Sequence, residues 1–388
     1  MYCHQCGEHV NYDKDNYCQA CGAKLEKEKV RAILHSEEIS EELSPHRINE
    51  KASQNFSEAM RSSFAKKELD RYVGDRRKIK MNVEQVFSEV FEKHTKDEAE
   101  MLFAAGTRAT TPKLRDIEAT WPKPWLFARV FLIFALTYIL LYIGINSFNN
   151  QNTLPGLIVV GSFAGPFALL IFFWEMNAPQ NVSIYETAQL FFVGGAASLV
   201  AALILYSIFP VENMDVVGAV MVGVIEEIGK LAIVAYFIKR MNPIYILNGL
   251  LIGAAIGAGF AAFESAGYAF RYMYEEGLDS MLEIIFLRGW QSVGGHVVWS
   301  AIGGAALMYA KGSEKLAPHH FFSSKFLKFF IIPIVLHALW DMIGWPYAVL
   351  LLIAVAWFFI YVMIHLGLKQ IVEMHDDEER RRRLSAMT

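Results

Sequence analysis

The chain has 388 residues, of which 54% are hydrophobic and 13% aromatic, and its formal net charge is −4 at pH 7. Charged residues are concentrated in the first third and at the C-terminal end, whereas the middle is strongly apolar. This division excludes one large soluble domain and predicts a soluble N-terminal part followed by an all-α polytopic membrane part. The first residues lack a basic stretch followed by an apolar one, so we expect no cleaved signal peptide and a cytoplasmic N-terminus.

All four cysteines lie near the N-terminus, at Cys3, Cys6, Cys18 and Cys21. Their spacing, Cys-x2-Cys-x11-Cys-x2-Cys, gives two similar turns, YCHQCG and YCQACG, and each turn offers a pair of thiolates to one tetrahedral ion. In a reducing compartment this pattern predicts a structural Zn²⁺ in a ribbon over residues 1–25, with a redox pair or two disulfides as the alternative. Because the ribbon has few basic residues, we expect it to bind a protein partner and not nucleic acid.

Residues 26–124 are predicted to form a charged cytosolic linker, because most of this stretch is polar and poor in aromatic residues. Apolar residues recur at helical spacing from Val83 to Phe91. This pattern predicts an amphipathic helix near 82–105, which begins at Asn82 and ends at Gly106. We expect it to dock within the chain, with the membrane surface or a partner protein as the alternatives.

Eight apolar segments follow, each long enough to cross a bilayer as a helix. They cover approximately 125–146, 155–174, 188–209, 216–238, 245–269, 284–310, 327–344 and 347–367. We therefore expect an eight-span membrane domain at 125–368 and a basic tail at 369–388. Lys and Arg gather in the connections after the fourth and sixth spans and in the tail, so the positive-inside rule predicts a multi-pass protein of the cell membrane with both termini in the cytoplasm.

The fourth span contains the sequence GVIEEIGKLAIV, with three ionisable residues in an apolar helix. On a helix, Glu226 and Glu227 lie four and three residues before Lys230, so both carboxylates can face the same cation. An ionisable side chain at the centre of a span costs about 2.5–3.5 kcal/mol on insertion scales. A simple membrane anchor would not keep three of them, which indicates a functional site.

The next three spans also carry residues that lipid would reject. The fifth has Phe260 one turn before Glu264, the sixth has His296, and the seventh has His337 one turn before Asp341. Counting residues from the outer ends of the spans places these side chains and the glutamates of the fourth span in the outer half of the bilayer, within reach of one cavity.

Carboxylates, imidazoles and an amine in one buried cavity suit the activation of water. A glutamate can act as the general base, while histidines donate to the oxyanion and later protonate the leaving amine. The sequence contains no His-Glu-x-x-His zinc motif, no second aspartate well within a span and no Gly-x-Ser-Gly nucleophile motif. Three alternatives stay open: a serine–histidine device built from Ser292 or Ser300 with His296, an ion- or proton-coupled transporter, and a non-catalytic scaffold.

The motifs Glu-Glu-x-x-Lys, Phe-x-x-x-Glu, an isolated histidine and His-x-x-Trp-Asp occur in this order on four consecutive spans. Together they resemble the PrsW family of intramembrane glutamic proteases, which is related to the CAAX prenyl endopeptidases. The chain departs from the CAAX pattern, Glu-Glu-x-x-x-Arg and Phe-x-x-x-His, at both early motifs.

The resemblance covers about 216–345 and implies a metal-independent protease that hydrolyses membrane-protein substrates in the bilayer, often in regulated proteolysis or stress signalling. It nominates as the catalytic residues Glu226, Glu227, Glu264, His296 and His337. Lys230, Phe260 and Asp341 are expected to support them, and the motifs do not decide which glutamate of the fourth span activates water.

Overall fold

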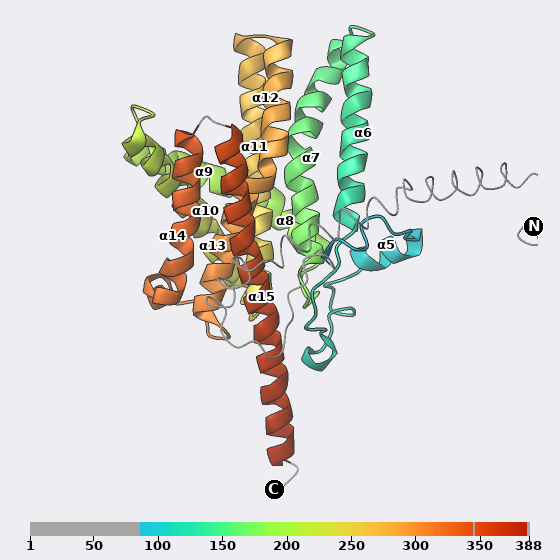
Figure 1. Cartoon of the computed structure of the whole chain (residues 1–388), viewed down its shortest axis with the longest axis vertical. Coiled ribbons are helices and arrows are strands. Elements are labelled where there is room, and N and C mark those ends of the chain that lie inside the picture. The colour runs from blue at the N-terminus through green and yellow to red at the C-terminus, as the bar shows by residue number, and fades with distance from the viewer. Residues whose placement is uncertain (1–85, 344–345, 386–388) are drawn as a thin grey trace, which may run out of the picture. The chain divides into compact units, whose positions relative to one another are not determined.

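The computed structural model describes residues 86–343 and 346–385, so the predicted zinc ribbon lies outside the described residues. The described residues all belong to one compact unit, Leu69–Thr388. Its regular elements are helices, and the described part of the chain contains no β-strand (Figure 1). The predicted all-α fold class is confirmed.

Helix α5, Lys96–Phe103, is the first regular helix of the described residues. Of the helix predicted near 82–105, residues 82–85 lie outside the described residues, and residues 87–91 form turns, so the described part is not one continuous helix. The helix begins late because Thr95 and Glu98 form a capping box, in which the Thr95 side chain accepts from the Glu98 amide and the Glu98 side chain accepts from the Thr95 amide. It also ends before Gly106, which has a φ of +80° and packs against the backbone of Val182.

The segment around α5 packs against the end of helix α7, Leu154–Glu175. Phe87 stacks on Phe172 with ring centroids 6.2 Å apart, and Phe103 stacks on Trp174 at 5.9 Å. The segment therefore docks within its own chain, as its apolar pattern predicted.

The eight apolar segments are all helical, and two of them are interrupted. The first is a single helix, α6, and α7 follows a short 3-10 turn. The bounds are α6 Leu126–Asn146, α7 Leu154–Glu175, α8 Ile184–Gln189 with a π-helical stretch Leu190–Gly194 and α9 Gly195–Ile208, α10 Val216–Met241, α11 Ile246–Glu275, α12 Leu278–Gln291 with a 3-10 turn Ser292–Gly294 and α13 His296–Lys311, α14 Ser324–Met342, and α15 Pro346–Ser385.

Six of these segments in the described part of the chain are long and apolar enough to cross a membrane, so the chain is a multi-pass membrane protein. The two that fall short are α10 and α14. Both carry charged residues, α10 in its centre and at its end and α14 at both ends. These charges lower the mean hydropathy of the two helices. The count of eight membrane crossings therefore stays a prediction.

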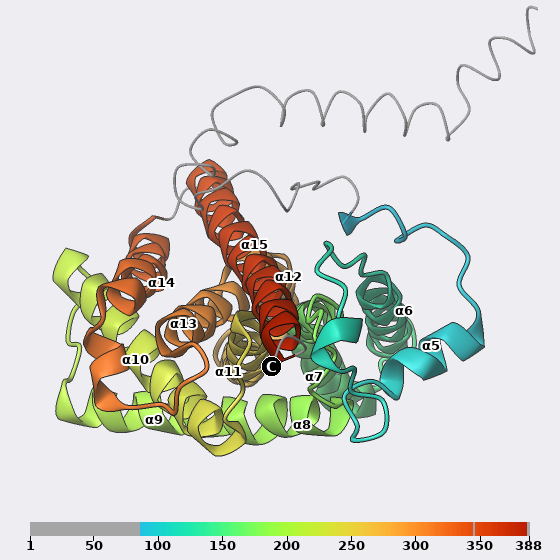
Figure 2. The ribbon, with the colours of Figure 1, turned by 90° about the horizontal axis from the view of Figure 1, so that it is seen from below.

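Helix α11 lies at the centre of the bundle, and its most extensive packing is against α13 (Figure 2). Small residues permit this close approach. A Cβ atom at Gly253 would lie 2.0 Å from the carbonyl oxygen of Ser300, and one at Gly249 would lie 2.4 Å from that of Gly304. The two backbones therefore touch, which fixes α13 relative to α11.

The sixth segment is broken between α12 and α13, and the break positions a site residue. Gln291 ends α12, a 3-10 turn covers Ser292–Gly294, and α13 begins at His296. The indole of Trp357 on α15 donates to the carbonyl of Val293 (2.8 Å), which satisfies one backbone group freed by the break. The break places His296 inside the bundle at the start of a helix.

The predicted tail is a continuation of the last span. Helix α15 runs without interruption from Pro346 to Ser385. Ion pairs at i,i+4 spacing, such as Lys369 with Glu373 and Arg383 with Glu379, line this polar extension.

Candidate active site

A cavity of about 200 Å³ lies among helices α9 to α14. It brings together most of the predicted site residues from four different spans. Those that line it are Glu226, Glu264, His296, His337 and Asp341, together with Tyr206, Arg288, Ser292 and Trp299. Glu227 and Lys230 border a separate void of about 10 Å³ behind them, between α10, α13 and α14.

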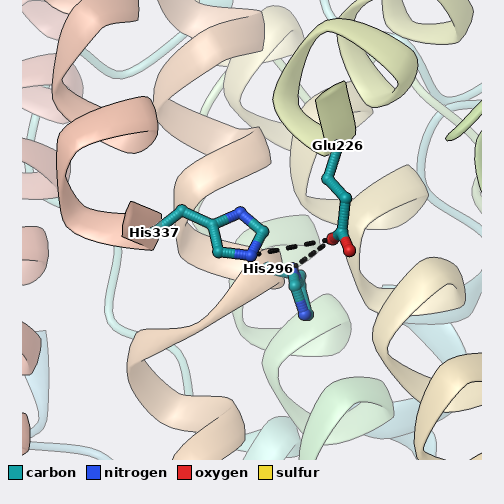
Figure 3. Close-up of side chains that lie close together, drawn as sticks. All are labelled: Glu226, His296 and His337. Atoms are coloured by element: carbon teal, nitrogen blue, oxygen red, sulfur yellow. Dashed lines mark ion pairs between the residues drawn. The ribbon is translucent and has the colours of Figure 1, made fainter. Parts of the chain in front are cut away.

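Glu226 is buried on α10 and faces the cavity. The hydroxyl of Tyr206 donates to its Oε1 atom at 3.0 Å. Its Oε2 atom has no hydrogen-bond partner among the described residues, although Lys230 Nζ lies 3.6 Å away, His337 Nε2 3.7 Å and His296 Nδ1 3.8 Å. Figure 3 shows the carboxylate of Glu226 reaching toward the two imidazole rings. Oε2 is therefore a buried acceptor with an open hydrogen-bonding position.

Glu227, the next residue on α10, points away from the cavity and is paired with Lys230 and His337. Its Oε1 atom lies 2.7 Å from Lys230 Nζ and 2.9 Å from His337 Nδ1. The side chain is only 2% exposed. Glu227 therefore balances the charge of Lys230 and orients His337, and its carboxylate is not directed into the cavity.

His337 presents one nitrogen to each of these two glutamates. With Nδ1–H donating to Glu227, its Nε2 atom faces the cavity, 3.7 Å from both Glu226 Oε2 and Asp341 Oδ2. Trp299 stacks on the ring at a centroid distance of 4.5 Å. Separations of this length leave room for a bridging water molecule.

His296 links Lys230 to Glu264. Lys230 Nζ lies 2.8 Å from His296 Nδ1, and His296 Nε2 lies 3.1 Å from Glu264 Oε2. The ring of Phe260 supports both partners, since Lys230 Nζ lies 4.4 Å from its centroid and the His296 ring 5.0 Å. Phe260 and Lys230 thus fix the position of the His296 ring.

The engagement of His296 also bears on the serine–histidine alternative. Ser292 donates to the carbonyl of Gly289 (2.7 Å), and the hydroxyl of Ser300 has no hydrogen-bond partner among the described residues. Neither serine is hydrogen-bonded to His296, whose nitrogens face Lys230 and Glu264. The geometry does not support a serine nucleophile here.

Tyr206 and Arg288, which bind the site glutamates from the cavity lining, were not predicted. Arg288 of α12 forms an ion pair with Glu264, donates to Ser265 (2.9 Å) and lies over the ring of Tyr268. Its only sequence signal is that Arg288 and Arg271 are the two basic residues on a side otherwise free of Lys and Arg. Tyr206 gave no signal, because a tyrosine near the end of a span is common at the membrane interface.

The fold and this cavity define a polytopic membrane protein with a buried site of carboxylates and imidazoles. Residues 185–366 match the model of the PrsW-protease family, described as PrsW family intramembrane metalloprotease. The match confirms the resemblance seen in the motifs: this part of the chain, from α8 to α15, is similar to the PrsW family of intramembrane proteases. No curated protein and no solved structure matches the chain significantly.

The family description raises the question of whether the site fits a divalent ion. Glu226, His296 and His337 offer ligand atoms within 4.8 Å of one another, which is close to the spacing around a zinc ion. However, the nitrogen that His296 turns toward Glu226 lies 2.8 Å from Lys230 Nζ. An ammonium group and a divalent cation a few ångströms apart repel strongly in a low-dielectric interior. The spacing suits a metal, but with Lys230 in this position the residues present do not fit one.

Proposed function

We propose that the protein is a glutamic intramembrane protease in which Glu226 activates the attacking water. The observation that carries this proposal is Glu226 Oε2, a buried carboxylate oxygen in the cavity with no hydrogen-bond partner among the described residues. A buried acceptor of this kind favours a bound water molecule, and a carboxylate within hydrogen-bond reach of a water can remove its proton.

In the proposed reaction, Glu226 takes a proton from water while the water oxygen attacks the carbonyl carbon of a peptide bond. The carbonyl oxygen becomes an oxyanion, and it accepts hydrogen bonds from donors that line the same cavity. His337, with a proton on Nε2, lines that cavity and is the proposed donor, whereas the Tyr206 hydroxyl already donates to Glu226 Oε1. The proton held by Glu226 then passes to the leaving nitrogen as the C–N bond breaks, which regenerates the carboxylate.

The remaining residues position these groups. Glu227 orients His337 through Nδ1, and Lys230 lies between Glu227 and His296. Both nitrogens of His296 are already engaged, by Lys230 and Glu264, so the geometry favours a positioning role for His296 and leaves the oxyanion to His337.

We further propose that the substrates are membrane proteins, cut near one end of a transmembrane segment during regulated proteolysis. At about 1.5 Å per residue, Glu226 lies about 15 Å from the start of α10, and His337 about 8 Å from the end of α14. Both ends belong to the side that the charge pattern assigns to the exterior. A scissile bond must come within about 3–3.5 Å of the attacking water, so the cut should fall toward the outer end of the substrate helix.

Purified protein incubated with single-span membrane substrates tests this proposal. We expect cleavage that continues after chelation of metal ions, both in the natural sequence and in a variant with all four cysteines changed to serine. Mass spectrometry of the products should place the new termini near the outer end of the substrate helix. Loss of activity on chelation in the cysteine variant, with recovery on adding Zn²⁺, would contradict the metal-independent mechanism.

A further inference from the structure

A second pocket, of about 570 Å³, is lined by the segment that follows α5 and by the helices α8 and α10. It shares no lining residue with the cavity that contains Glu226. The pocket lies where α8 begins, at Ile184, and where α10 ends, at Met241. The charge pattern assigns both of these helix ends to the cytoplasmic side. The pocket is therefore at the level of the phospholipid headgroups on that side.

Two exposed arginines from distant parts of the chain line this pocket, Arg108 from the segment after α5 and Arg240 from the last turn of α10. Neither guanidinium group forms an ion pair or a hydrogen bond with any residue that the structure describes. Arg288, on the outer side, is by contrast paired with Glu264. The second pocket therefore offers two guanidinium groups whose donors are open to a ligand.

Among the described residues, Glu186 is the only carboxylate that lines this pocket, and it is used by the backbone. Its Oε2 atom accepts from the amide of Ser183 at 3.0 Å and from the Ser183 hydroxyl at 3.2 Å. These contacts belong to the capping box that begins α8. Two positive charges therefore face one negative charge that already has partners, and the pocket favours an anion.

The segment that carries Arg108 is fixed in place beside α8. The hydroxyl of Thr110 donates to the carbonyl of Ala104 at 2.6 Å, which closes the turn around Arg108. Gly106 has a φ of +80°, and a Cβ atom there would lie 2.3 Å from the carbonyl carbon of Val182. The close packing of these two backbones positions Arg108 at the pocket without a ligand.

Apolar surface continues from the pocket toward the membrane interior. Phe237 lines the pocket itself. One turn deeper than Arg240 on the same face of α10 is Tyr236, which is 56% exposed. About one turn deeper than Gln189, which also lines the pocket, is Phe192, which is 49% exposed. A ligand with an anionic head and apolar chains fits this combination.

We propose that this pocket binds an anionic phospholipid, with its phosphate between Arg108 and Arg240 and its acyl chains along the exposed apolar faces of α9 and α10. The planar guanidinium group matches phosphate oxygens, and basic pockets between spans on the cytoplasmic side suit anionic headgroups. A bound lipid links the segment after α5 to α10, the helix that carries Glu226. Binding requires no peptidase activity, so its test is independent of the proposed function.

Thermal unfolding of the full-length protein in a neutral detergent, titrated with phosphatidylglycerol, tests the site. A lipid that binds the folded protein raises the unfolding midpoint, and the titration gives an apparent Kd. Arg108→Ala and Arg240→Ala should each raise this Kd about fivefold. Lys239→Ala is the matched control, because Lys239 is exposed beside Arg240 but does not line the pocket, and it should leave the Kd near that of the natural sequence.

Phosphatidylcholine and inorganic phosphate show which part of the ligand is recognised. Neither should raise the midpoint as phosphatidylglycerol does, because the first carries a compensating cation and the second has no acyl chains. An equal shift with either compound would overturn the proposal, as would the absence of any shift with phosphatidylglycerol. Equal increases in Kd for Lys239→Ala and Arg240→Ala would also contradict it, since they would indicate a general attraction to the basic end of α10.

Discussion

Two neighbouring glutamates on α10 serve two different regions of the molecule. Glu226 faces the cavity, with one carboxylate oxygen lacking a hydrogen-bond partner among the described residues, while Glu227 lies in the packed interface with α13 and α14 and is paired with Lys230 and His337. Successive residues on a helix are about 100° apart, so one residue can face the cavity and the next the interface. Identical side chains thus acquire different roles from what surrounds them.

Substitution of Glu227, which faces the packed interface, should give the largest loss of folding stability. Glu227→Ala leaves the buried Lys230 and His337 without their partner, and breaking a buried ion pair costs about 3–5 kcal/mol. Chemical unfolding in detergent should show this loss. Glu226→Ala is the matched control on the cavity side and should lose much less. Equal losses in the two variants would show that the two glutamates do not differ in this way.

A second variant tests whether the interface between α11 and α13 supports the site. A Cβ atom at Gly253 would lie 2.0 Å from the Ser300 carbonyl oxygen, so Gly253→Ala should separate the helices at a cost of about 1–3 kcal/mol. Gly267 is the matched control on the same helix, because nothing lies within 4 Å of its Cβ position. Gly267→Ala should leave thermal unfolding unchanged or raise its midpoint. The reverse order of stabilities would contradict the packing described here.

The smallest of these effects is expected at Arg288, one of the residues that line the cavity. Arg288→Ala removes the ion pair to Glu264 and should lower turnover about tenfold, or about 1.4 kcal/mol in activation free energy. Arg271→Ala is the control, since Arg271 pairs weakly with the exposed Glu275 at 4.0 Å. Steady-state rates with one membrane substrate compare the two. Equal turnover in both variants would show that Arg288 does not contribute to the reaction.

The spans and the convergence of the motifs could be predicted from the sequence, because apolar length and charge inside lipid are strong signals. Predicted and observed bounds of most spans agree within a few residues; for example, 125–146 was expected where α6 covers Leu126–Asn146. The start of α5 could also have been predicted, because Thr95 and Glu98 have the spacing of a capping box. The helical spacing of apolar residues from Val83 to Phe91 favoured an earlier start instead, and the capping box was therefore missed.

The division of labour within the site was not predictable from spacing alone. Glu226 lies four residues before Lys230 and Glu227 three, so the spacing lets either carboxylate face the lysine. Only the rotation of α10 against its neighbouring helices gives the two residues different surroundings. Tyr206 reaches Glu226 from α9, and Arg288 reaches Glu264 from α12. Both contacts depend on how the helices pack, which a single sequence does not specify.

The role of Glu226 as the base is tested most directly by Glu226→Gln, measured for turnover and for unfolding in the same preparation. The amide keeps the size of the side chain but cannot take a proton from water, and a general base contributes about 10²–10⁴-fold to the rate. We expect cleavage to fall by that factor while the unfolding midpoint stays near that of the natural sequence. A variant that folds normally and cleaves its substrate at the original rate would contradict the mechanism.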